Sequence, residues 1–264
     1  MTLSKRPLGS TGMAASILGL GTVKLGRDQG VKYPSSFRIP NDREAASLLA
    51  LAAELGINLL DTAPAYGTSE ERLGTLLAGQ RERWLICTKV GEEFDAGHSS
   101  FDFSPQHTRM SIERSLQRLR TDRLDIVLVH SDGNDLDVIR NTGVIETLAD
   151  LKAAGKIRAF GMSTKTLEGG LLAAEMTDCV MVAWNLDYAA DVPIIERCRE
   201  LGKGVLIKKA LASGHATVAG EDPVARSFTT IFAHPGVTSA VVGTINPEHL
   251  RSNVQIANQV SSGH

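Results

Sequence analysis

The chain repeats an alternation of two hydrophobic patterns over most of its length. Short continuous apolar runs, rich in Val, Ile and Leu, alternate with longer segments in which apolar residues recur every three or four positions. The first pattern is typical of strands buried on both faces, and the second of amphipathic helices. We predict strands over residues 16–20, 57–60, 84–90, 124–129, 159–162, 180–184, 205–208 and 240–242.

Helix boundary signals lie between these strands. Gly56 follows a helical pattern, as glycine commonly does just past a helix end, and Ser104-Pro105 combines an N-cap residue with proline at the first helical position. We predict helices over residues 42–55, 69–77, 105–119, 144–154, 193–201 and 223–232, with further helices after Thr166 and Asn246.

Eight successive strand–helix units predict an α/β fold, namely a (β/α)8 TIM barrel. A doubly wound open sheet is the alternative. Barrels of this kind commonly reach 264 residues as one domain, so we expect a single domain over residues 1–264. The turn signal in RPLGSTG, before Ser16, predicts a short N-terminal β-hairpin that closes the bottom of the barrel.

Reactive side chains follow several of the predicted strands. Asp61, Lys89 and His130 end the second, third and fourth strands, and Tyr66 lies in the loop after the second. In this fold the active site lies at the C-terminal ends of the strands, so we expect the four to meet at one mouth. Each alone has an ordinary structural explanation, such as a carboxylate capping loop amides. The four together are difficult to explain in that way.

Proton transfer gives the set a chemical reason. Tyrosine, with a pKa of about 10, is a poor acid or base at neutral pH, and a nearby ammonium lowers that pKa. We expect Lys89 to do this for Tyr66, Asp61 to keep Lys89 charged, and His130 to bind a substrate oxygen. Such a site handles the proton of an alcohol or carbonyl group.

Composition narrows the possible partners. The chain is 42% hydrophobic and 22% charged with a net charge of -2 and no long run of one sign, which argues against binding to nucleic acid or an anionic membrane. No apolar run is long enough to span a bilayer. Cys87, Cys179 and Cys198 are widely spaced, so we expect buried free thiols and a cytoplasmic protein. The histidines show no metal-ligand spacing, and we expect no metal.

The sequence resembles the aldo-keto reductase superfamily. The motifs that carry the resemblance occur in the family's order over nearly the whole chain: GLGT at 19–22, LLDTAPAYGTSEERLG at 59–74, TKVG at 88–91, RLDIVLVHSDG at 123–133 and GTINPEHLRSN at 243–253. The resemblance implies the same barrel, hydride transfer between NAD(P)H and a small carbonyl compound or alcohol, and a catalytic tetrad of Asp61, Tyr66, Lys89 and His130.

The resemblance also implies where the cofactor binds. The nicotinamide carboxamide falls near Ser163 and Asn185, and its ribose near Thr22 and Asp61. The phosphates fall at the start of the last helix, where free backbone amides suit an anion. The implied contacts are Thr22, Asp61, Ser163, Asn185, Lys208, Gly243, Thr244, His249, Arg251 and Asn253.

Three departures from the family pattern affect these expectations. Lys208 and Lys209 stand where many members have an aromatic residue that stacks on the nicotinamide; either lysine meets the pyrophosphate or points to solvent. Gly243 and His249 replace basic residues common in NADP-preferring members, and Arg251 can compensate, so NADP(H) is favoured over NAD(H). The C-terminal segment that shapes the substrate pocket is short, which predicts an open pocket.

Two other functions stay open. Lys89 or Lys208 would be the strand-end lysine of a Schiff-base aldolase, although pairing with Asp61 argues against Lys89 because an imine-forming lysine must be neutral. A catalytically weak NADP-binding regulatory protein would keep the tetrad. Segments 27–40 and 92–103 are predicted to form mobile pocket walls that hold the specificity. Substrate, reaction direction and oligomeric state are left open.

Overall fold

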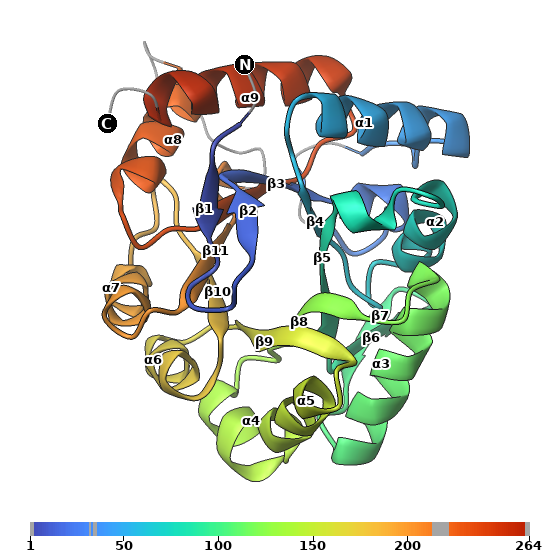
Figure 1. The fold of residues 1–264 in the computed structure, drawn as a ribbon, viewed down its shortest axis with the longest axis vertical. Coiled ribbons are helices and arrows are strands. Elements are labelled where there is room, and N and C mark those ends of the chain that lie inside the picture. Colours follow the sequence, from blue (N-terminus) through green and yellow to red (C-terminus); the bar gives the residue numbers. More distant parts are fainter. Residues whose placement is uncertain (1–2, 32, 34–35, 213–221, 262–264) are drawn as a thin grey trace.

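The computed structural model describes residues 3–31, 33, 36–212 and 222–261. Within them, eight parallel strands form a closed barrel in the order β10-β11-β12-β3-β4-β5-β8-β9 (Figure 1). The predicted barrel is confirmed, and the open sheet is excluded because β12 pairs with β3, with Ala240 opposite Leu18. The barrel strands are β3 (Leu18–Gly21), β4 (Leu59–Asp61), β5 (Leu85–Val90), β8 (Leu124–His130), β9 (Ile157–Ser163), β10 (Cys179–Ala183), β11 (Gly204–Lys208) and β12 (Ser239–Val242).

Helices surround the barrel, as Figure 1 shows. They are α1 (Asp42–Glu54), α2 (Ser69–Leu76), α3 (Pro105–Leu119), α4 (Asp135–Asn141), α5 (Val144–Ala153), α6 (Leu167–Met176), α7 (Val192–Glu200), α8 (Pro223–Ala233) and α9 (Pro247–Ser261), with 3-10 turns η1 (Val23–Leu25) and η2 (Arg81–Arg83). The predicted helices are confirmed to within a residue or so, and Ser104 caps α3 by accepting a hydrogen bond from the His107 amide. The short helix α4 was not predicted.

The N-terminal hairpin is confirmed, but it includes a residue that was predicted to belong to the first barrel strand. Strands β1 (Lys5–Pro7) and β2 (Ala14–Ser16) pair antiparallel, and the barrel strand begins only at Leu18. The chain changes sheet at Ile17, whose amide bonds to Ser4 O at 3.0 Å. Ser16 is part of the hairpin, and Asn58 Oδ1 accepts its amide. One continuous apolar run spans both strands, so the hydrophobic pattern alone hides this break.

The hairpin closes one end of the barrel with apolar side chains. Leu8 and Met13, in and beside its turn, are buried in the same cluster as the barrel residues Leu59, Ile126 and Leu206. A larger cluster fills the layer between strands and helices. The interior of the barrel is therefore a packed core, and the opposite end, where the strands finish, is left for the site.

A second hairpin, β6 (Glu92–Asp95) and β7 (His98–Phe101), follows β5. It lies in one of the segments expected to be a pocket wall. Its strands lack the apolar alternation that signals a strand. Ala96 and Gly97 both have positive φ, 46° and 88°, as the tightest hairpin turns require. The glycine in DAGH was the one sequence signal for this turn.

Candidate active site

The C-terminal ends of the barrel strands surround a cavity of about 920 Å³. Its lining includes Tyr66, Lys89 and His130 of the predicted tetrad. The same cavity also holds many of the expected cofactor contacts, namely Ser163, Lys208, Gly243, Thr244, His249 and Asn253. The structure thus brings together residues from strands, loops and the helix α9, spread over nearly two hundred positions.

An ion pair lies at the base of the site. Lys89 Nζ donates to Asp61 Oδ1 at 2.6 Å and to Thr62 O at 2.9 Å. Lys89 is 1% exposed and Asp61 5%. Burial alone would lower the pKa of Lys89, but the adjoining Asp61 carboxylate opposes burial, and the pKa stays above its ordinary value. Lys89 therefore stays charged, as the sequence argument expected.

Tyr66 lies beside this pair, with Lys89 Nζ 4.8 Å from its ring centroid. Its ring meets the His130 ring edge-on, with the centroids 6.3 Å apart. Burial raises the pKa of Tyr66, and Lys89 only partly opposes the rise, while Asp61 adds to it. Lys89 acts on the Tyr66 pKa in the expected direction, but loss of solvent around the phenolate is the larger effect and keeps that pKa above its ordinary value. Tyr66 is held as a protonated phenol.

Two glycines fix the loop that carries Tyr66. Gly67 has φ +60°, and a Cβ there would lie 2.1 Å from Gly26 O; a Cβ on Gly26 would lie 2.4 Å from Tyr66 O. Beneath the loop, the Thr22 hydroxyl donates to Asp61 O and contacts Ser69 Oγ at 2.8 Å. Thr22 is fully buried, so it supports the loop and does not line the cavity.

His130 has a partner that sequence reasoning missed. Its Nδ1 lies 2.7 Å from Glu92 Oε2, on the first residue of β6. Burial lowers the pKa of His130, Glu92 raises it, and Lys89 lowers it further. Glu92 was included only within a pocket-wall segment, since nothing in the sequence places it opposite His130.

Lys208 points into the cavity and not to solvent. Its Nζ donates to Ser163 Oγ at 2.9 Å and to Thr164 O at 2.7 Å. No carboxylate pairs with it among the described residues. Burial, followed by repulsion from Lys209, lowers the pKa of Lys208 to about 7.

Asn185 and Arg251, like Thr22 and Asp61, are expected cofactor contacts that lie outside the cavity lining. Asn185 Nδ2 donates to Lys209 O at 3.1 Å, and its Oδ1 accepts the Asp187 amide. Arg251 is half-exposed and lies 4.0 Å from Glu248 on the same helix. Both residues border the region where the lining residues of β11 and α9 lie.

The charge of the cavity suits an anionic cofactor. Among the described residues, its lining contains no aspartate or glutamate, while it includes Lys24, Lys165, Lys208, Lys209 and His249. A Cβ at Gly243 would lie 3.0 Å from the hydroxyl of Tyr33, whose ring lies 3.9 Å from Lys24 Nζ. The bare glycine lets the Tyr33 hydroxyl lie this close to the backbone after β12. The residues present therefore fit a dinucleotide.

Metal-ligand groups and membrane-spanning helices are both absent from the part of the chain that the structure describes. There, no group of three or more His, Cys, Asp or Glu could hold a metal ion. Nor does this part contain a helix with the length and apolar character needed to cross a membrane. Cys87, Cys179 and Cys198 are buried and free, as predicted.

Comparison with known proteins gives concordant results. The model of the Aldo/keto reductase family matches residues 17–227. A solved structure from Pseudomonas aeruginosa, assigned to the aldo-keto reductases, is 58% identical in sequence; the match covers 97% of this chain and 94% of that one, with a TM-score of 0.89. An uncharacterized oxidoreductase of Bacillus subtilis is 27% identical, over 97% of this chain and 92% of that protein. Pyridoxal 4-dehydrogenase of Microbacterium luteolum is also 27% identical, over 95% and 92%.

Proposed function

Because the chain belongs to the aldo/keto reductase family, whose named relatives are oxidoreductases and dehydrogenases, we propose that its cavity interconverts a carbonyl compound and the corresponding alcohol with Tyr66 as general acid and base. The chain is an NAD(P)H-dependent enzyme of this family. The observation that carries the proposal is the buried Lys89–Asp61 ion pair beside a protonated Tyr66 at the cavity wall.

Tyr66 donates the proton in the reducing direction. Its burial keeps the phenol protonated at neutral pH, so it is ready to protonate an alkoxide oxygen that develops in the cavity. The Lys89 ammonium stabilises the phenolate that is left, and Asp61 keeps that ammonium charged. In the reverse direction the same phenolate accepts the alcohol proton. His130 lines the cavity beside Tyr66 and positions the substrate oxygen.

NAD(P)H supplies the hydride when bound. Ser163 and Lys208 would hold the nicotinamide end, and Gly243, Thr244, His249 and Asn253 the adenosine end. We favour NADP(H) over NAD(H), because a cavity lined by basic side chains without described carboxylates suits an additional phosphate. Asn185 and Arg251 would join these contacts only by turning away from Lys209 O and Glu248.

Lys208 supports a second candidate function. A buried amine whose pKa falls to about 7 is partly neutral at physiological pH, which is what imine formation with a carbonyl compound requires. Lys89 is unsuited to this role because its ion pair keeps it charged. Borohydride reduction in the presence of an aldehyde, followed by peptide mass spectrometry, distinguishes the two functions. A reductase leaves Lys208 unmodified, and an aldolase leaves a stable adduct on it.

The experiment for the main proposal combines binding and turnover. Protein fluorescence is titrated with NADPH and NADH, and carbonyl reduction is measured for wild type, Tyr66→Phe and Tyr33→Phe. We expect micromolar binding in all three, tighter for NADPH. Turnover should fall by about 10²–10⁴-fold in Tyr66→Phe only, because that variant loses the general acid. Tyr33→Phe is the matched control, since Tyr33 lines the same cavity.

Full turnover by Tyr66→Phe would overturn the catalytic assignment. Binding of both cofactors without turnover on a broad panel of carbonyl compounds would favour the regulatory alternative.

A further inference from the structure

A carboxylate lies against the ring of His130. Glu92 Oε2 lies 2.7 Å from His130 Nδ1, and the side chains are 12% and 21% exposed, respectively. A carboxylate at neutral pH only accepts hydrogen bonds, so Nδ1 must carry the hydrogen in this contact. That assignment leaves Nε2 as the other ring nitrogen, and His130 lines the cavity.

Glu92 is itself fixed in place. Ser99, on the facing strand of the hairpin, donates its hydroxyl to Glu92 Oε1 at 2.6 Å. Arg27 Nη1 lies 4.0 Å from the same oxygen and also donates to Ala65 O, next to Tyr66. The guanidinium of Arg27 lies 3.4 Å from the ring centroid of Phe94 in β6. Glu92 therefore joins the hairpin, the His130 ring and the Tyr66 loop.

We propose that Glu92 is a positioning residue for the reaction: its carboxylate fixes the tautomer and orientation of His130, directs Nε2 to the substrate oxygen, and stabilises the charged form of the ring. Such a carboxylate–imidazole pair determines which nitrogen carries the hydrogen, and hence what the other nitrogen can do. Nε2 accepts a hydrogen bond from an alcohol when the ring is neutral, and donates one to a carbonyl oxygen when it is charged.

The other charged groups around His130 act against its charged form. Lys89 on β5 and Lys208 on β11 both lower the pKa of His130, and burial lowers it more than either. Tyr66, from the loop after β4, faces the ring as a neutral phenol. Glu92 provides the opposing negative charge, and its own pKa, raised by burial but lowered more by His130, Ser99 and Arg27, falls to about 2. It stays ionised throughout the working pH range.

The role of His130 in this proposal rests on the proposed function, but the pairing does not, so the test begins with a readout other than activity. The pKa of His130 is measured by NMR titration of its ring proton, identified by loss of the signal in His130→Asn. We expect Glu92→Gln to lower that pKa by about one unit, because a carboxylate in contact is lost. Glu92→Asp should restore part of it.

Glu93→Gln is the matched control. Glu93 is the next residue of β6 and contacts Arg114 and His107. Its loss disturbs the same hairpin but not His130. In pH profiles of carbonyl reduction, the limb that follows His130 should move to lower pH in Glu92→Gln, with about a tenfold loss of kcat/KM at neutral pH and an unchanged Kd for NADPH.

An unchanged His130 pKa in Glu92→Gln would overturn the proposal, as would an equal shift in Glu93→Gln. Full activity of Tyr66→Phe would instead overturn the proposed function, and the NMR titration would still report on the pairing.

Discussion

Glu70 shows how a single buried residue affects stability away from the site. Its side chain is fully buried behind β5, where Thr88 donates to Oε1 at 2.6 Å and Arg118 lies 3.6 Å from Oε2. Burial raises the pKa of Glu70, although Thr88, Ser115 and Arg118 oppose the rise. The folded state therefore binds the proton more tightly than the unfolded chain.

Replacing Glu70 with Gln removes the free-energy cost of keeping an ionised carboxylate buried. The pKa of Glu70 is higher in the folded state than in the unfolded state. The free energy of unfolding therefore falls as the pH rises from the unfolded-state pKa to the folded-state pKa. We expect Glu70→Gln to be more stable than wild type at pH 8, by roughly 1 kcal/mol, with the difference shrinking toward pH 4.5. Urea unfolding at several pH values measures it.

Glu71→Gln is the control, because Glu71 also contacts Arg118 but is exposed. Lower stability of Glu70→Gln at pH 8 would mean that the contact with Arg118 outweighs burial.

At the residue scale, the sequence was enough to identify the reactive residues that directly follow an apolar strand. Asp61, Lys89 and His130 end apolar strands, so their meeting followed from the barrel. Glu92 did not follow, because it lies in an element that the hydrophobic pattern did not reveal. The net direction of the Tyr66 pKa shift was also missed, since it depends on burial that only the packed structure shows.

Among the elements, the loop after β4 is the one whose position decides the chemistry. Gly67 and Gly26 let it approach the turn after η1, and Tyr66 precedes Gly67. We expect Gly67→Ala to lower kcat by roughly 100-fold while the fold and the Kd for NADPH are kept, because a displaced loop misplaces the phenol. Steady-state kinetics and cofactor titration measure the two effects.

Gly79→Ala controls for backbone strain. Gly79 also has positive φ, +76°, but a Cβ there meets nothing within 4 Å. It should lose stability of about 1 kcal/mol without losing activity. If Gly67→Ala kept the wild-type kcat, the close approach of the two glycines would not be what positions Tyr66.

The elements found from sequence were those with strong periodicity. The barrel strands are buried on both faces and the long helices have one apolar face, and these patterns are readable. The β6–β7 hairpin and α4 are short and polar. The hydrogen bonds that hold them, such as Ser99 to Glu92, depend on polar side chains that the hydrophobic pattern does not report.

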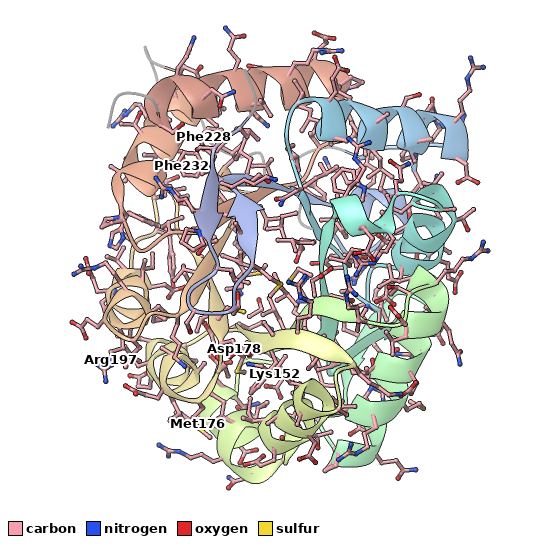
Figure 2. All side chains as sticks on the ribbon, in the orientation of Figure 1. Lys152, Met176, Asp178, Arg197, Phe228 and Phe232 are labelled. Atoms are coloured by element: carbon pink, nitrogen blue, oxygen red, sulfur yellow. The ribbon has the colours of Figure 1, made fainter. Side chains whose placement is uncertain are left out.

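For the whole molecule, Arg6 links the first hairpin to the end of α8 and to the segment before β12. It donates to Phe232 O at 2.7 Å and to Val237 O at 2.9 Å. Its guanidinium lies 5.9 Å from the centroid of the Phe232 ring. Phe232 in turn packs against Phe228, also on α8, and both residues are labelled in Figure 2. We expect Arg6→Met to lower the free energy of unfolding by about 2 kcal/mol, because two carbonyls lose a charged donor.

Activity should be unaffected in that variant, since the hairpin closes the end of the barrel opposite the cavity. Lys5→Met, at an exposed neighbouring position, should leave stability within about 0.5 kcal/mol of wild type. A large loss of kcat/KM in Arg6→Met would show that the two ends are coupled.

The pairing of β12 with β3 also determines when the barrel can close during synthesis of the chain. During synthesis, the strands up to β11 can form only an open sheet, with β3 and β11 as unpaired edges that invite association between nascent chains. Closure waits for β12, which brings Ala240 to Leu18 across almost the full length of the chain, a slow contact to form. The carbonyls that Arg6 binds come shortly before β12, and the cavity residues from Gly243 to Asn253 follow it. Nearly the entire chain must therefore leave the ribosome before the barrel can close and the cofactor site can be complete.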